Sequence, residues 1–547
     1  MWYNIDRCEI TGEERLYMIR VNEVKLSLEE TVDIIPHKLA KLLRIRLEDI
    51  ISYKIYKESI DARKAGQVYF VYTVDVETID EEKLLQKNSQ LVKTPDMQYH
   101  EVPKGTIQFK YRPVVIGFGP SGMFAGLILA QRGYRPIILE RGQDVDNRTK
   151  DVEEFWKFGK LNPESNVQFG EGGAGTFSDG KLTTRIKDRR CRKILEELVS
   201  AGAPKEILYS HKPHIGTDVL KQVVKNIRCK IEQLGGEIYF SSKVTDFIIN
   251  GENLTSIEIN GQEKIPAEAV ILGIGHSSRD TYEVLNNRKV QIRQKPFAIG
   301  VRIEHQQRAI NKAQYKEFAE HPRLGAADYK LTYQTKEGRA VYTFCMCPGG
   351  TVVAAASEEG GVVTNGMSEY ARNKENANSA LLVQVKTEDF GSNHPLAGVE
   401  FQRKWEKAAY RAAGSNYNAP TQRVGDFMQD KVSADAGNVI PTYLPGVTWC
   451  NLKECLPDFV ITSIKEAIPK FEQRMKGFAI EEAVMTGVET RSSAPVRIER
   501  AEDVMESVNV KGLFPVGEGA GYAGGIISAA ADGMKAAEMI IMKFSHI

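Results

Sequence analysis

Apolar and polar residues alternate along short stretches of the first hundred residues, a pattern that predicts paired β-strands. Residues 49–60 and 66–78 alternate most regularly. Before them, residues 31–45 carry apolar positions at helical spacing. The polar segment from Lys87 to Gly105 contains two prolines and reads as a linker. The pattern therefore predicts a separate small α+β module over residues 1–105, whose role the sequence leaves open.

The pattern changes after Tyr111, where longer apolar runs replace the alternation. Residues 113–142 consist of an apolar strand, a glycine turn, a helix of small residues and a second apolar strand. The uncharged part, Pro113 to Ala130, is long enough to span a membrane, but its glycines and proline favour a strand–turn–helix unit. Short strands follow between residues 243 and 275. This order of strands and helices predicts an α/β domain.

Glycines in the first turn of this domain indicate its chemistry. Gly117, Gly119 and Gly122 form a GxGxxG pattern between strand and helix, and Glu140 ends the next strand. Gly117 permits the tight turn, Gly119 lets the backbone approach a pyrophosphate, and Gly122 lets helix and strand pack closely. The pyrophosphate would lie on the free N–H groups of the helix N-terminus, and Glu140 can accept hydrogen bonds from a ribose diol. The segment predicts dinucleotide binding, because a turn used only for packing would not account for Glu140.

Three further glycine-rich segments, residues 169–185, 269–282 and 514–533, have the small side chains that a closely approaching cofactor requires. The first could be a flexible surface loop, but its regularly placed apolar residues argue against that interpretation. The second could be a modified NAD(P)H fingerprint. That interpretation is rejected because no strand with a terminal acidic residue follows it.

Residues 113–142 resemble the FAD-binding signature of the glutathione-reductase-like superfamily, including the proline after the second glycine and the sequence LERG after the second strand. With the segments KPHIGTDVL, KPFAIGVRIEH, FCMCPGGTVVAA, VETRSSAPVRI and GEGAGYAGGI, the whole chain resembles bacterial FAD-dependent dehydrogenases described as NAD(FAD)-utilizing dehydrogenases. The resemblance implies FAD and an α/β fold. A two-layer, Rossmann-like FAD-binding domain of the glutathione-reductase type would comprise residues 106–295 and 485–547. A β-rich substrate domain would be inserted over residues 296–484.

The resemblance also implies which part of FAD each segment contacts. Residues 172–175 would run along the pyrophosphate and the flavin edge, and Glu518 would replace the aspartate that usually binds a ribityl hydroxyl. The helix from Ile526 would point its N-terminus at the flavin N1–C2 carbonyl edge, where reduction deposits negative charge. The residues expected to contact the cofactor are Gly117, Gly119, Pro120, Ser121, Gly122, Glu140, Arg141, Gly172, Gly173, Ala174, Gly175, Thr176, Lys181, Val244, Gly273, Gly275, His276, Gly517, Glu518, Gly524, Gly525 and Ile526.

Candidates for catalysis are polar residues beside these segments, because hydride transfer to flavin N5 needs few protein groups. His214 could carry a proton, although a helix cap or a ribose contact is the preferred interpretation. His276 could cap the helix that follows it or touch the cofactor. Arg302 could bind a substrate carboxylate or form a surface ion pair, and Arg491 could touch cofactor or substrate. The sequence identifies none of the four as the catalytic residue.

Cys345 and Cys347 form a CxC pair on a predicted strand, where both side chains would point to one face. The pair could be redox-active or half of a metal site. No further Cys or His lies at a short spacing that would complete a metal site, and strand geometry disfavours a bridge between the two. The preferred interpretation is two small buried residues before a turn. No metal is predicted, and redox activity is left open.

Composition limits the other function classes. The net charge of +1 gives no electrostatic argument for nucleic acid or an anionic membrane as partner. Seven scattered cysteines favour a reducing compartment, and the segment MWYNIDRCEI has no secretory-signal pattern. We therefore expect a cytoplasmic protein with a small-molecule substrate and an undetermined oligomeric state.

The predicted function is an FAD-dependent oxidoreductase that transfers a hydride between an organic substrate and flavin N5, with NAD(P)H as a candidate electron partner. Two alternatives stay open. One is a flavin monooxygenase, and the other is a flavoprotein that acts in RNA modification or as a scaffold with the N-terminal module as its adaptor.

Overall fold

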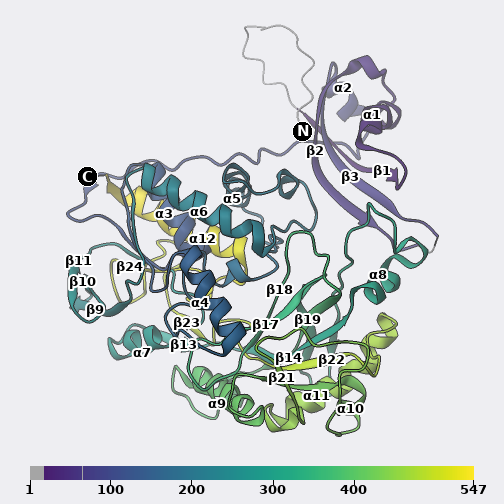
Figure 1. Cartoon of the computed structure of the whole chain (residues 1–547). Helices are drawn as coiled ribbons and strands as arrows, with labels where there is room; N and C mark the ends of the chain where they lie inside the picture. The colour runs from purple at the N-terminus through teal and green to yellow at the C-terminus, as the bar shows by residue number, and fades with distance from the viewer. Residues whose placement is uncertain (1–17, 65, 547) are drawn as a thin grey trace.

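The N-terminal module contains a four-stranded antiparallel sheet in the order β2-β3-β1-β4 (Figure 1, purple). The computed structural model describes residues 18–64 and 66–546, so the segment MWYNIDRCEI lies outside the described residues. Helix α1 buries Ile35, Leu39 and Leu43 against the sheet, the spacing of one helix face. The elements are β1 (Ile19–Ser27), α1 (Ile35–Leu43), β2 (Ile50–Asp61), β3 (Tyr69–Thr78), α2 (Glu81–Lys87) and β4 (Val92–Lys93).

A five-stranded parallel sheet forms the centre of the second unit, in the order β24-β12-β6-β7-β8. Its strands are short and almost wholly apolar, as expected for a sheet covered on both faces. The last strand of the chain in this sheet pairs with β12, and β12 pairs with β6, so a C-terminal strand lies two places from the first strand of the sheet. The strands are β6 (Val114–Ile116), β7 (Ile137–Leu139), β8 (Glu237–Tyr239), β12 (Val270–Leu272) and β24 (Leu513–Pro515).

Alternate residues of these strands face two different layers. Val115 and Ile271 pack against helices α3, α6 and α12, which lie side by side in Figure 1. Val114 and Leu272 pack on the opposite face against the small antiparallel sheet β11-β10-β9. The parallel-sheet unit therefore has three layers, and the expected two-layer arrangement is wrong. The covering elements are α3 (Pro120–Gln131), α5 (Arg189–Ser200), α6 (Thr217–Gln233), α12 (Ile526–Lys543), β9 (Val244–Asn250), β10 (Asn253–Ile259) and β11 (Glu263–Pro266).

A seven-stranded sheet forms the third unit, in the order β15-β16-β19-β14-β22-β20-β21 (Figure 1, green). Its buried face packs on α11, whose Val460, Ile464 and Ile468 lie in the same apolar cluster as Val301 and Leu381 of the sheet. Strand β22 belongs to this sheet, so the predicted boundary after residue 484 falls at its first residue. The strands are β14 (Phe297–Gln306), β15 (Thr332–Gln334), β16 (Ala340–Cys347), β19 (Asn376–Val385), β20 (Ala419–Arg423), β21 (Val447–Trp449) and β22 (Val484–Glu489).

The remaining elements connect these units. Helices are α4 (Val145–Phe158), α7 (Arg279–Asn287), α8 (Gln307–Tyr315), α9 (Ala397–Ala412), α10 (Val424–Met428) and α11 (Asp458–Arg474), and strands are β5 (Ile107–Gln108), β13 (Ile292–Gln294), β17 (Thr351–Ala354), β18 (Thr364–Met367), β23 (Val496–Ile498) and β25 (Phe544–Ser545). Residues 113–130 form β6 and α3, as predicted. Within the described residues, none of the helices combines the length and the apolar character that crossing a membrane requires.

Candidate cofactor site

The turn between β6 and α3 is built for close approach of backbone to backbone. Gly117 has a φ of 91°, in the region that favours glycine. A Cβ on Gly122 would lie less than 3.0 Å from the carbonyl oxygen of Gly117, which no real Cβ tolerates. Gly119 is the N-cap of α3 and provides no side chain to cap it. The first N–H groups of the helix are therefore available to an external acceptor.

The turn before α12 has the same character. Gly525 is its N-cap, again without a side-chain cap. A Cβ on Gly524 would meet no atom within 4 Å, and the same holds for Gly275 after β12. Because the glycines at these two turns face open space, a ligand can lie directly on their backbone.

One cavity of about 390 Å³ lies between the two helix N-termini, a size typical of small-molecule sites. Most of the residues predicted to contact a cofactor line it. They are Gly117, Gly119, Pro120, Ser121, Glu140, Arg141, Gly173, Ala174, Gly175, Lys181, Val244, Gly273, Gly275, His276, Glu518, Gly524, Gly525 and Ile526. The tertiary structure thus brings all four glycine-rich segments to one place.

Four predicted residues do not line the cavity, and each has a structural role instead. Gly122 packs against Gly117, and Gly172 occupies a left-handed turn with a φ of 83°. The Thr176 hydroxyl donates to the Glu171 carbonyl at 3.3 Å. The Gly517 N–H donates to Asp532 at 2.7 Å. That these four also touch the cofactor stays a prediction.

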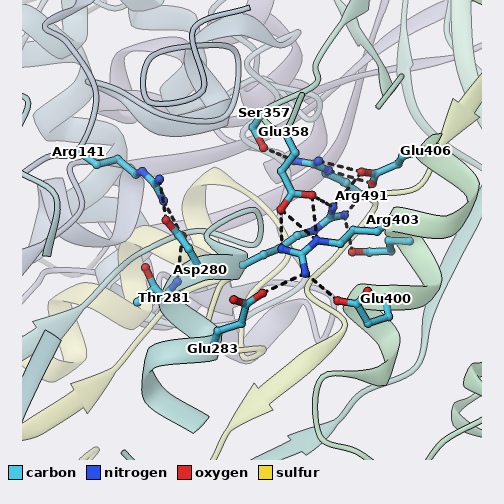
Figure 2. Close-up of polar contacts among 12 residues, drawn as sticks. Arg141, Asp280, Thr281, Glu283, Ser357, Glu358, Glu400, Arg403, Glu406 and Arg491 are labelled. Atoms are coloured by element: carbon cyan, nitrogen blue, oxygen red, sulfur yellow. Dashed lines mark hydrogen bonds and ion pairs between the residues drawn. The ribbon is translucent and has the colours of Figure 1, made fainter. Parts of the chain in front are cut away.

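Backbone N–H groups of the first glycine turn and of nearby loops hold the Glu140 carboxylate in place. The carboxylate accepts hydrogen bonds from the backbone N–H groups of Phe118 at 2.7 Å, and of Gly142 and Gly170, both at 2.9 Å. These bonds orient a buried carboxylate at the cavity wall, where its remaining acceptor capacity can serve a ribose hydroxyl. Arg141, the next residue, pairs with Glu164 at 2.6 Å. It also pairs with Asp280 at 2.9 Å, as Figure 2 shows.

Glu518 lines the opposite part of the cavity. Burial raises the pKa of its carboxyl to about 7, against the opposing effect of the nearby Lys295 ammonium. Burial in turn lowers the pKa of Lys295, and Glu518 counteracts this. The carboxyl can therefore hold or release a proton near neutral pH.

The raised pKa predicts how Glu518 affects stability. The folded state keeps the proton up to about pH 7 while the unfolded chain loses it near its ordinary value, so this group makes the free energy of unfolding fall as pH rises between about 4.3 and 7. We expect Glu518→Gln to flatten this fall by up to about 1.4 kcal/mol per pH unit in urea unfolding of the cofactor-free protein. The exposed Glu502→Gln should leave the slope unchanged, and an equal slope in Glu518→Gln and wild type would contradict the prediction.

Three of the four catalytic candidates line the cavity. His276 is held neutral, because burial, together with Arg491 and Arg279, lowers its pKa to about 3. Its Nδ1 lies 2.9 Å from the Ser277 hydroxyl. His214 lies outside the cavity lining, and its Nε2 lies 3.0 Å from the Tyr370 carbonyl oxygen.

Arg302 forms an ion pair with Glu489. The expected ion pair therefore exists, but it is buried and not at the surface. The Arg302 guanidinium is fully buried and donates to both carboxylate oxygens of Glu489. It also donates to the Cys345 carbonyl oxygen at 2.8 Å. Burial raises the pKa of Glu489 to about 7, although Arg302 opposes this effect. With its donors engaged in this way, Arg302 is poorly placed to bind a substrate carboxylate.

Arg491 belongs to a buried network that joins the parallel-sheet unit to the seven-stranded unit (Figure 2). Glu406 of α9 accepts from Arg491 at 3.0 Å and from Arg279, the first residue of α7, at 2.7 Å. Glu358 accepts from Arg279 and Arg403, both at 2.7 Å. Burial disfavours the charged form of Glu406, but the two arginines outweigh it and lower the pKa of the carboxyl. The network fixes the wall of the cavity that carries Arg491 and His276.

Several lining residues were not predicted from the sequence, among them Glu489, Phe344 and Ser492. The sequence did contain a signal that could have identified Glu489. Arg302 and Glu489 stand in otherwise apolar strand segments, FAIGVRI and VMTGVE. A buried charge needs a partner, so these two could have been paired. The cysteine pair was interpreted as buried, which holds for Cys347, whereas Cys345 lines the cavity.

The lining fits FAD in its chemistry. Two uncapped helix N-termini suit the pyrophosphate and the electron-rich flavin edge, and a buried carboxylate stands beside the first of them. Open space over Gly275 and Gly524 leaves room for a flat ring and its chain. Among the described residues, no group of three or more Cys, His, Asp or Glu side chains is arranged to hold a metal ion.

Comparisons with known proteins agree with this assignment. Residues 296–492 match the family described as FAD-dependent protein, C-terminal domain-like, and residues 18–77 match a domain of unknown function (DUF8436). An uncharacterized protein of Clostridium beijerinckii is 55% identical over 533 residues, which cover 96% of this chain and 99% of that protein. The digeranylgeranylglycerophospholipid reductase of Haloferax volcanii is 27% identical over 169 residues, 31% of this chain and 36% of that protein.

Similarities to solved structures are looser. The flavin-dependent brominase Bmp2, as a triple mutant, has a TM-score of 0.35 at 14% identity and covers 79% of this chain and 80% of its own. Glycine oxidase from Bacillus cereus has a TM-score of 0.32 at 12% identity and covers 80% of this chain and 99% of its own. These TM-scores are too low to bear on the function.

The predicted α/β fold and the predicted FAD are confirmed at the level of the family, by the C-terminal domain match and the parallel-sheet unit that adjoins it. The chain belongs to the same family as the Clostridium beijerinckii protein and is an FAD-dependent enzyme of the oxidoreductase class.

Proposed function

We propose that this protein transfers a hydride between a small organic substrate and the N5 atom of FAD, as a dehydrogenase or reductase of the NAD(FAD)-utilizing type. The observation that carries the proposal is one cavity that reaches from the uncapped N-terminus of α3 to that of α12. When bound, FAD supplies the hydride-accepting atom. The protein supplies binding, orientation and protons.

Each end of the cavity suits one end of the cofactor. The backbone at Gly119 and Ser121 would bind the pyrophosphate, and Glu140 would bind the adenosine ribose. The backbone at Gly524 and Gly525 would lie under the flavin ring, with the positive end of the α12 dipole towards its pyrimidine side.

A second cavity of about 400 Å³ offers the substrate a place beside the flavin end. It shares Phe344, Ser492 and Gly524 with the first cavity. Tyr342 and Phe344 form an aromatic wall with ring centroids 6.4 Å apart, and Lys295 contributes a cation. We infer a small substrate with an apolar part and an anionic group. Glu518 would hold or release the proton that accompanies hydride transfer.

Support for a small-molecule partner comes from the aromatic wall of this second cavity. The 27% identity to a reductase over part of the chain supports the reductase direction. We further propose that NADH or NADPH acts as a transient electron donor.

Purified full-length protein is expected to be yellow, or to become so with FAD, with about one FAD per chain. Under anaerobic conditions NADH or NADPH should bleach the flavin absorbance near 450 nm, and an organic acid substrate should restore it. Glu518→Gln should bind FAD yet slow the substrate step by roughly 10²–10⁴-fold, the usual contribution of general acid–base catalysis.

A protein that stays colourless with excess FAD would overturn the proposal. NAD(P)H oxidation that needs both oxygen and an aromatic substrate would favour a monooxygenase instead. As a matched control, Glu502→Gln should behave as wild type, because this exposed carboxylate lines neither cavity.

A further inference from the structure

The Cys345–Met346–Cys347 segment at the end of β16 departs from regular strand geometry. Phe344 pairs with Ala380 of β19 and Cys347 pairs with Asn378, so one extra residue is accommodated as a β-bulge. Cys345 has a φ of 43°, a left-handed conformation that is unusual for a residue with a side chain. As a result the two cysteine side chains have different surroundings. Cys345 lines the FAD cavity and Cys347 is fully buried behind it.

Two cations hold this bulge in place. Arg302 donates to the Cys345 carbonyl oxygen at 2.8 Å, and the Lys181 ammonium donates to the Met346 carbonyl oxygen. The Cys347 thiol donates to the Cys345 carbonyl oxygen at 3.3 Å. The bulge therefore places both cysteines in an electropositive part of the cavity wall.

This environment favours a thiolate at Cys345. The hydrogen bond from the Cys347 thiol lowers the pKa of Cys345; burial opposes this, and Arg302 and Lys181 add to it, whereas Asp179 acts in the opposite direction. The pKa of Cys347 is raised by its hydrogen bond to Cys345 and by burial. By contrast, burial raises the pKa of Cys191 to about 11. A thiolate beside a neutral thiol is the arrangement found in reactive cysteine pairs.

We propose that Cys345 and Cys347 are a redox pair that exchanges two electrons with the flavin. In the oxidising direction a bond forms between the two Sγ atoms, and the proton of Cys347 leaves to solvent with any proton on Cys345. The two electrons would pass to the bound flavin. In the reverse direction the cysteine pair would take up two electrons from the reduced flavin and a proton from solvent at Cys347, and the S–S bond would break. This activity goes beyond the proposed function, because hydride transfer at N5 does not need a second redox centre.

The distances allow such a bond. Residues two apart in a regular strand are separated by about 6.6 Å between Cα atoms. A disulfide spans roughly 4.4–6.8 Å, so a regular strand lies at the upper limit. The bulge takes the segment out of regular strand geometry, and the Cys347 thiol turns back to within 3.3 Å of the Cys345 carbonyl oxygen. The regular strand on which the expectation of no bridge rested is therefore absent at this point.

The first test uses the thiols themselves and needs no flavin. Tryptic cleavage after Arg339 and Arg372 releases a peptide that contains Cys345 and Cys347 and no other cysteine. After mild oxidation with diamide, then denaturation and alkylation, this peptide should lose both alkyl groups and 2 Da. Cys345→Ser and Cys347→Ser should abolish that loss, and Cys191→Ser should retain it. Full alkylation of the wild-type peptide after diamide would overturn the proposal.

The second test counts electrons in the FAD-loaded protein. Anaerobic dithionite titration of the oxidised wild type should consume four electrons per FAD, two for the flavin and two for the disulfide. Cys345→Ser and Cys347→Ser should consume two electrons per bound FAD, while Cys191→Ser should consume four. A wild-type endpoint of two electrons would overturn the redox pair. A colourless protein would contradict the proposed function and the exchange with the flavin, whereas the thiol test would still decide whether the two cysteines form a disulfide.

Discussion

Replacing Glu406 by glutamine is expected to lower the free energy of unfolding by about 3–5 kcal/mol, the usual cost of removing one partner from a buried ion pair. The glutamine keeps the shape of the side chain but loses its charge. Arg279 and Arg491 are almost fully buried, and Arg491 would keep only its bond to the Ser357 hydroxyl among the side-chain bonds of the described residues (Figure 2). Arg491 would then be a buried cation without a carboxylate partner, while Arg279 would keep its ion pair with Glu358. Urea unfolding followed by circular dichroism measures the loss.

Glu400→Gln is the matched control. It lies on the same helix and also pairs with an arginine, Arg403, but its side chain is 66% exposed. Removing it should cost at most about 1 kcal/mol. If both variants lose the same free energy, the buried network does not stabilise the fold in the way described.

The pH dependence gives a second readout of Glu406. Its pKa is lowered in the folded state, so its contribution is complete above the ordinary carboxyl pKa of about 4.3 and declines as pH falls towards the folded-state value. The difference between wild type and Glu406→Gln should be constant from pH 7 to about pH 5 and shrink only at lower pH.

Replacing Gly122 by alanine is expected to weaken FAD binding at least about 100-fold, equivalent to about 2.7 kcal/mol. Its new Cβ would lie less than 3.0 Å from the carbonyl oxygen of Gly117. Backbone atoms cannot yield as a flexible side chain can, so α3 would move away from β6 and carry its N-terminus out of the cavity. Titration of the cofactor-free protein with FAD, followed by absorbance, measures the affinity.

Gly325→Ala serves as the control, since a Cβ there meets no atom within 4 Å and the residue lines neither cavity. It should bind FAD as wild type does. Retained affinity in Gly122→Ala, with a native circular dichroism spectrum, would show that the close packing at this turn is not needed for the cofactor.

Much of the cofactor site was predictable because its parts are local. The turn at Gly117 and the uncapped helix after Gly119 depend on a few consecutive residues. The same is true of the turn at Gly524 and Gly525. The third layer of the FAD-binding unit was not predicted, because short apolar strands do not reveal which second sheet will cover them.

The sequence by itself determined the turn chemistry, the apolar strands and the glycine-rich segments, because backbone conformation and helix N-termini are properties of neighbouring residues. Only the tertiary structure decided the partners of the buried charges. Arg302 and Glu489 are 187 positions apart, and Arg279 and Glu406 are 127 apart. Likewise, only the pairing with β19 produces the bulge that turns Cys345 into the cavity. Burial makes an unpaired charge costly, so partners must meet, but burial itself exists only once the sheets and helices have packed.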